Sequence, residues 1–190
     1  MERILIDGDS LTLEDVEKVA MGRTWVEMSP RALQKVKECR GYLEDILLRG
    51  SVVYGINTGF GHLSDVRIQP EDILTLQRNL VYSHAAGVGP PFLEEDVRAI
   101  MLLRANVLAK GYSGVRTEVI QALIEMLNRQ VLPVIPQKGS VGASGDLAPL
   151  AHLALVLIGQ GEAFYRGERL PGAEALSRAG IPPLCLQAKE

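Results

Sequence analysis

Residues 142–149 read Gly-Ala-Ser-Gly-Asp-Leu-Ala-Pro, a stretch that can react with itself. If the amide nitrogen of Gly145 attacks the carbonyl carbon of Ala143, a five-membered ring closes. Loss of two waters, one of which carries away the Ser144 hydroxyl, leaves a methylidene-imidazolone. Glycine suits the attacking position because it has no side chain and tolerates strained backbone angles. Asp146 could orient the carbonyl or move a proton, so the segment is a candidate built-in electrophile.

Other interpretations of this stretch start from the same serine. Ser144 followed by Asp146 is also typical of a helix N-terminus, with the serine as N-cap and the acid in the first turn. A nucleophile elbow requires Gly-x-Ser-x-Gly, and Asp146 stands where its last glycine belongs. A phosphate-binding loop ends in Gly-Lys-Ser/Thr, whereas Lys138 precedes these glycines. The tripeptide alone leaves cyclisation and helix capping open.

Two further side chains could carry chemistry. Tyr54 lies in the glycine-rich stretch 51–64, where a tyrosine either packs with its hydroxyl satisfied or acts as a base. His84 lies near the expected end of a helix, where a histidine usually stabilises the last turn. His62 and His152 are isolated, so the sequence predicts no metal site. The helical arginines are expected to make surface ion pairs; they are Arg78, Arg98, Arg104 and Arg116.

Composition narrows the class of protein. The 190 residues suffice for one domain or a large part of one, and the net charge of −3 comes without a basic stripe, which argues against nucleic-acid binding. The N-terminus lacks the apolar core of a signal peptide, and the longest apolar run, 147–158, is too short to cross a membrane. Cys39 and Cys185 lack metal-ligand spacing and fit idle thiols in a reducing compartment. We therefore expect a cytoplasmic protein that binds neither nucleic acid nor membrane.

Apolar periodicity and capping residues predict mostly helix with a few short strands. A glycine-rich loop at 51–64 is expected to follow a short strand, and a hairpin is expected around 166–168. The sequence shows no repeat or linker. The remaining expected elements are a strand at 3–6 and helices at 12–20, 29–49, 70–85, 94–110, 116–129, 147–159 and 173–179. Thr12 and Ser29 are expected to cap the first two helices, and Gly180 is expected to end the last one.

Three segments together resemble the aromatic amino acid ammonia-lyase family, and most closely its histidine-specific members. They are residues 54–61 (YGINTGFG), 77–87 (QRNLVYSHAAG) and 139–150 (GSVGASGDLAPL). Their order and spacing match the family, and the resemblance covers essentially all 190 residues. It implies a mainly α fold, the N-terminal part of a multihelical, aspartase-like architecture. Residues 1–190 would then be one N-terminal portion of a longer chain whose C-terminal helical bundle lies outside this sequence.

The resemblance also implies a cofactor and a reaction. Ala143, Ser144 and Gly145 would form 4-methylidene-imidazol-5-one without any external cofactor, supported by Asp146. The full-length enzyme would eliminate ammonia from L-histidine, without oxidation, to give urocanate.

Roles for the remaining site residues follow from the same resemblance. Tyr54 would remove the β-proton of the substrate. The pair Ser83 and His84 would select the side chain, with His84 contacting the imidazole. Family members specific for tyrosine or phenylalanine carry other pairs at this position.

Members of this family form homotetramers in which three subunits build each active site. We therefore expect residues 1–190 alone to be inactive, to leave the ring unformed or partly formed, and to self-associate through the apolar helix at 147–159. The alternatives are a tyrosine or phenylalanine ammonia-lyase, an aminomutase of the same family, or a non-catalytic helical assembly module.

Overall fold

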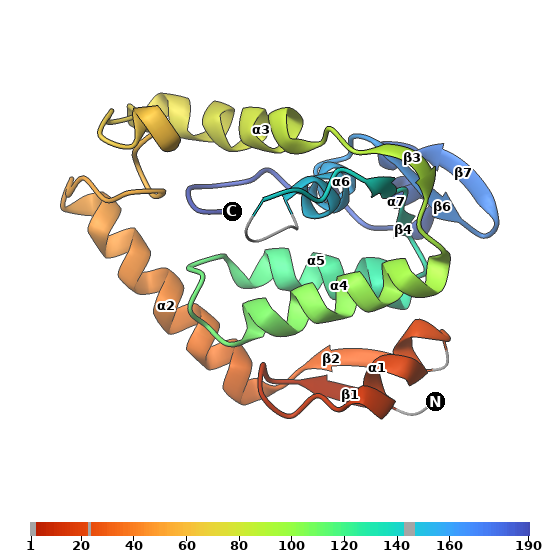
Figure 1. Ribbon diagram of the computed structural model, residues 1–190. Coiled ribbons are helices and arrows are strands. Elements are labelled where there is room, and N and C mark those ends of the chain that lie inside the picture. Colours follow the sequence, from red (N-terminus) through yellow and green to blue (C-terminus); the bar gives the residue numbers. More distant parts are fainter. Residues whose placement is uncertain (1–2, 23, 143–146) are drawn as a thin grey trace.

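The computed structural model describes residues 3–22, 24–142 and 147–190 (Figure 1). Its elements in chain order are β1 (Arg3–Ile6), α1 (Leu13–Ala20), β2 (Trp25–Met28), α2 (Pro30–Leu48), the 3₁₀ helices η1 (Gly61–Leu63) and η2 (Pro70–Asp72), α3 (Ile73–His84), β3 (Val88–Pro91), α4 (Glu94–Ala109), α5 (Thr117–Asn128), β4 (Leu132–Pro133), β5 (Pro136–Lys138), α6 (Leu147–Leu157), β6 (Glu162–Tyr165), β7 (Glu168–Pro171) and α7 (Gly172–Ala179).

Helices α4 and α5 lie side by side at the centre (Figure 1). Met101 and Ala105 of α4 are buried because their four-residue spacing places them on one face of the helix, and Ile120 of α5 is fully buried as well. The buried apolar residues form one continuous cluster that extends from Ile4 to Ile181. This cluster connects the N-terminal elements on one side of α4 and α5 with α6 and α7 on the other.

The N-terminal layer consists of β1, α1 and β2. The two strands pair in parallel, and α1, which lies between them in the chain, packs against α4. Thr12 caps the start of α1 as predicted, and the structure shows that it forms a capping box with Asp15. Strand β2 was not predicted; it is fixed by α5, where the side chain of Asn128 bonds both backbone groups of Val26 at 2.9 and 2.8 Å.

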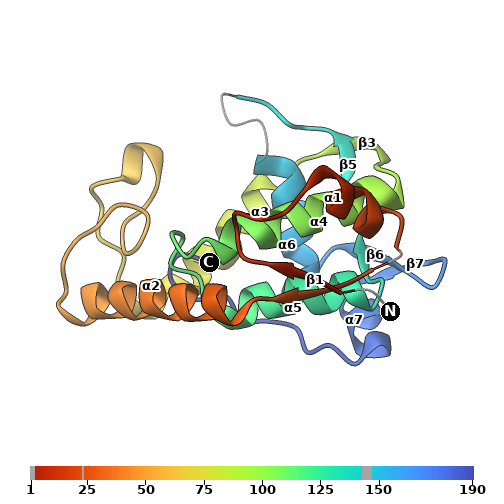
Figure 2. The ribbon, with the colours of Figure 1, turned by 90° about the horizontal axis from the view of Figure 1, so that it is seen from below.

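A long connection joins α2 to α3 and projects away from the rest of the molecule (Figure 2). Ser29 caps α2 as predicted. The prediction of a short strand before the glycine-rich loop is wrong, because the backbone groups of Val53 form hydrogen bonds within a turn. Its amide donates to Oδ1 of Asn57 at 2.9 Å, and its carbonyl accepts from the amides of Ile56 and Asn57. A valine whose backbone groups are held within a turn cannot pair with a strand.

The C-terminal half carries the other short strands. The predicted hairpin is confirmed as β6 and β7, joined by Arg166 and Gly167 with φ of 52° and 81°, the positive angles of a two-residue turn. Strands β3 and β5 pair antiparallel and were not predicted, because proline and glycine dominate them. Helix α6 ends at Leu157, two residues before the predicted end. The mainly helical class is confirmed.

Among the described residues, no helix is both long and apolar enough to span a membrane. The same residues contain no cluster of three or more metal-ligating side chains.

Candidate active site

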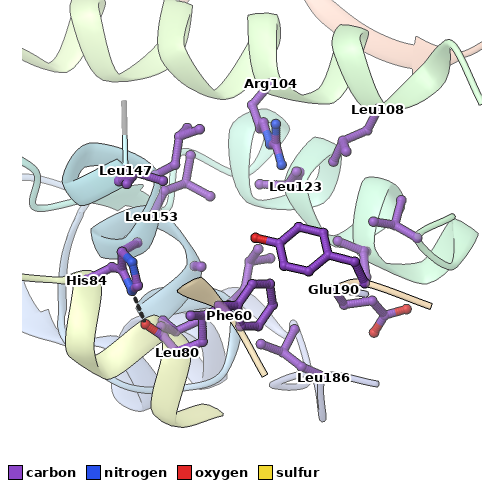
Figure 3. A pocket seen from close by; sticks show the side chains of 18 residues that line it. Phe60, Leu80, His84, Arg104, Leu108, Leu123, Leu147, Leu153, Leu186 and Glu190 are labelled. Carbon is purple, nitrogen blue, oxygen red and sulfur yellow. Dashed lines mark hydrogen bonds between the residues drawn. The ribbon is translucent and has the colours of Figure 1, made fainter. Parts of the chain in front are cut away.

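A cavity of about 520 Å³ lies between α3, α4, α5, α6 and the last residues of the chain (Figure 3). Most of its wall is apolar and comes from leucines of these helices. Among the residues that the structure describes, the polar lining groups are Tyr54, His84, Arg104 and Glu190. A mostly apolar cavity of this size with a few polar groups is typical of a small-molecule site.

His84 is the last residue of α3 and enters the cavity wall from there. Its Nδ1 lies 2.9 Å from the carbonyl oxygen of Leu80 and 3.0 Å from Oγ of Ser83, whose hydroxyl itself donates to Leu80. A carbonyl only accepts, so Nδ1 carries the proton and Nε2 of the neutral ring is an acceptor. The histidine therefore caps the last turn with one nitrogen, as the helix-end interpretation predicts, and keeps the other for a ligand. Ser83 is exposed and supports the ring rather than lining the cavity.

Tyr54 lines the cavity from the connection between α2 and α3. The turn that follows it is held by Thr58, which is buried and accepts the amide hydrogen of Gly55 at Oγ1. Gly55 has φ of +70°, which glycine adopts without strain. The Tyr54 ring meets the edge of Phe60 at 6.0 Å between centroids, and 60% of the residue is exposed. The ring thus packs on one side while the phenol remains accessible.

Glu190 lies on the side of the cavity opposite His84 (Figure 3) and belongs to an ion pair with Arg116. The side chain of Glu190 is fully buried, and both its oxygens accept from the Arg116 guanidinium at 2.7 Å. Burial favours a higher pKa for Glu190, but hydrogen bonds from Arg116 and the amide of Gln187 outweigh it and lower the pKa. The same contact raises the pKa of Arg116. The expectation of a surface ion pair at Arg116 was wrong, because its partner Glu190 lies 74 residues away and has a fully buried side chain.

Arg40 of α2 binds the same C-terminal segment. Its Nη1 donates to the carbonyl oxygens of Gly114 and Ala188 at 3.1 and 3.0 Å, although only 9% of its side chain is exposed. Arg104, half-buried on α4, brings a further guanidinium into the lining. The sequence did not predict Arg40 or Arg104 as site residues, because the groups around them come from distant segments of the chain.

The predicted electrophile lies outside the described residues: Ala143, Ser144, Gly145 and Asp146. Both flanks of this segment are described. On one side Leu147, the first residue of α6, lines the cavity. On the other side Gly139 packs so tightly that a Cβ there would stand 2.9 Å from Cα of Gly87 and 3.3 Å from Cβ of Ala148. The structure thus brings Tyr54, His84 and Leu147, the residue that follows Asp146 in the chain, to the same cavity.

The sequence model of the family described as aromatic amino acid lyase matches residues 11–190. This chain belongs to that family. A relative described as histidine ammonia-lyase from Stigmatella aurantiaca is 57% identical over 188 residues, which cover 99% of this chain and 37% of the relative.

Solved structures also resemble this chain. Histidine ammonia-lyase from Trypanosoma cruzi superimposes with a TM-score of 0.90 at 36% identity, covering 99% of this chain and 36% of that one. Tyrosine aminomutase from Streptomyces globisporus gives a TM-score of 0.90 at 39% identity, covering 98% and 35%. These matches confirm the predicted family and fold. The chain spans somewhat more than a third of the length of the relatives it matches.

Proposed function

We propose that the protein containing this chain is a histidine ammonia-lyase, which eliminates ammonia from L-histidine to give urocanate. The observation that carries the proposal is the position of His84. Its Nδ1 is occupied by the last turn of α3, so Nε2 is the nitrogen that can accept a hydrogen bond in a cavity otherwise walled mainly by leucines. The relatives described as histidine ammonia-lyases support the same substrate.

The proposed electrophile is 4-methylidene-imidazol-5-one formed from Ala143, Ser144 and Gly145. The described flanks fit such a group, because Gly139 on one flank lies against Ala148 on the other and so brings the two flanks together. When formed, the group supplies an electrophile that binds the substrate amine and makes it a better leaving group. Asp146 would support it, and no external cofactor or metal is proposed.

Tyr54 is the proposed base. Elimination from histidine requires loss of a β-proton that is not acidic, so a positioned base must take it as ammonia leaves. The phenol of Tyr54 belongs to the cavity lining and remains accessible, and its ring is steadied by Phe60. These properties suit a group that must meet a substrate carbon.

His84 is proposed to select the imidazole side chain, with Ser83 fixing its orientation. An acceptor at Nε2 matches the N–H of the substrate imidazole, whereas a phenyl ring would leave it unpaired. A buried polar group without a partner costs about 1–3 kcal/mol, which is enough for marked discrimination.

The remaining proposals concern assembly. A homotetramer is proposed from the family resemblance, with further substrate-binding groups supplied by residues outside this chain. A cytoplasmic location is proposed from Cys39 and Cys185, which fit idle thiols of a reducing compartment. Residues 1–190 are proposed as one N-terminal portion of that protein.

The direct test is a comparison of L-histidine, L-tyrosine and L-phenylalanine as substrates for the purified full-length gene product. We expect urocanate and ammonia from L-histidine and little turnover of the other two. A preference for tyrosine or phenylalanine would replace the proposed substrate. Formation of a β-amino acid would identify an aminomutase, and absence of all turnover would leave the non-catalytic alternative.

A further inference from the structure

His152 lies on α6 outside the cavity, although its neighbours Leu150, Ala151 and Leu153 line it. It is half-buried, and its Nε2 accepts a hydrogen bond from the amide of Gly87 at 3.1 Å. This acceptor role requires an unprotonated Nε2. Burial lowers the pKa of His152, which keeps the ring in the neutral form that can accept.

The contact at Gly87 joins segments that matter for the proposed reaction. Gly87 follows His84 by three residues. A Cβ on Gly87 would stand 3.0 Å from Nε2 of His152 and 3.2 Å from Cβ of Pro136, so no larger residue fits without displacement. Gly139, four residues before Ala143, also packs against Gly87.

The pairing of β3 with β5 holds the same junction. Val88 pairs with Lys138, so the residues next to Gly87 and Gly139 are already fixed in register. Ala148, on the first turn of α6, lies against Gly139. The end of α3, the entry to the electrophile segment and the helix that leaves it therefore meet at one point, and the imidazole of His152 bonds across it.

We propose that His152 is a positioning residue that holds His84 in a fixed relation to both flanks of the segment 140–146. Its role in catalysis rests on the proposed function, whereas its role as a clamp is a property of the fold. His152 acts through Gly87 and does not touch the cavity. Small displacements of a positioned group lower reaction rates by large factors, so loss of the hydrogen bond between His152 and Gly87 should lower kcat.

The experiment compares His152→Leu, which cannot accept a hydrogen bond, with His152→Gln, whose amide oxygen can. Both are made in the full-length gene product, together with His62→Leu, the same change at an exposed histidine of η1. The first readout is hydrogen–deuterium exchange of the peptide covering residues 85–89. The second is kcat and KM for L-histidine.

We expect His152→Leu to exchange faster at 85–89, to lose about tenfold or more in kcat, and to retain its fold by circular dichroism. His152→Gln should restore both readouts most of the way, and His62→Leu should leave exchange at 85–89 unchanged. Unchanged exchange in His152→Leu, or faster exchange with unchanged kcat, would overturn the proposal. Loss of kcat in His152→Leu that the glutamine does not restore would also overturn it. If the unmodified enzyme makes no urocanate, the proposed function fails, and the exchange data still decide whether the clamp exists.

Discussion

Arg116 and Glu190 form a bidentate ion pair in which Nε and Nη2 of the guanidinium each lie 2.7 Å from a carboxylate oxygen. The Glu190 side chain is fully buried, and it also accepts the backbone amides of Arg116 and Gln187. A carboxylate in this setting anchors the C-terminal segment against α5. It thereby fixes the cavity wall opposite His84.

Removing the charge of Glu190 should destabilise the protein strongly. Glu190→Gln leaves the guanidinium of Arg116 without its counter-ion, and breaking a buried ion pair costs about 3–5 kcal/mol. Urea unfolding measures the change in the free energy of unfolding. The matched control is Glu168→Gln, whose exposed partner is Arg178, and this change should cost less than about 1 kcal/mol. Equal effects of the two substitutions would contradict the anchoring role.

Tyr54→Phe should abolish most turnover without changing the fold. The substitution keeps the ring that packs on Phe60 and removes the proposed base, which typically costs about 10²–10⁴-fold in kcat. Tyr42→Phe removes a hydroxyl from an exposed tyrosine of α2 and serves as the control. Normal turnover by the folded Tyr54→Phe enzyme would place the base elsewhere.

His84→Leu should lower kcat/KM for L-histidine about tenfold to a hundredfold, because the substrate imidazole loses its hydrogen-bond partner. Turnover of L-phenylalanine should fall less, since its ring needs no such partner. Steady-state kinetics on both substrates check this prediction. An equal loss on both substrates would show that His84 supports the fold of the site rather than its selectivity.

The full-length gene product should be lighter than its encoded mass. Ring formation removes two waters, a deficit of about 36 Da, by intact-mass spectrometry. Ser144→Ala should show its full encoded mass, because no β-hydroxyl remains to leave. A wild-type protein without the deficit would contradict the proposed electrophile.

His152 should make stability depend on pH. Its pKa is lower in the folded protein than the ordinary value of 6.5, so the unfolded chain binds the proton more readily. The contribution of neutral His152 to the free energy of unfolding is fully present above about pH 6.5. It is lost as pH falls through the pKa of His152 in the folded protein. The unfolding free energy of the wild type should therefore fall relative to that of His152→Gln as pH falls through this range. The other two histidines are common to both proteins, so the difference isolates His152. A constant difference would contradict the prediction.

Local sequence signals predicted most helices and the hairpin, because caps, glycines and prolines act on their own neighbours. Thr12 and Ser29 begin their helices, and Gly180 in the left-handed conformation ends α7 as expected. Strand β2 escaped prediction because its partners, β1 and Asn128, are distant in sequence.

The residues of the candidate site also fall into those that local motifs predicted and those that only the fold revealed. Tyr54 and His84 belong to short motifs and were identified as candidates, and the structure places them in one cavity. No local sequence motif marks Arg40, Arg116 or Glu190 as a site residue, because each binds a partner more than 70 residues away. Such pairs become visible only when the fold brings them together.

The contacts of Arg40 also constrain the order of folding. Its guanidinium bonds the carbonyl of Ala188 across 148 residues, one of the longest loops the chain closes. Closing such a loop is entropically unfavourable until the intervening elements are in place, and long-range contacts slow folding. During synthesis α2 leaves the ribosome long before residue 188 exists. The guanidinium of Arg40 must therefore stay hydrated until late, and the wall it completes is expected to be among the last parts of the cavity to form.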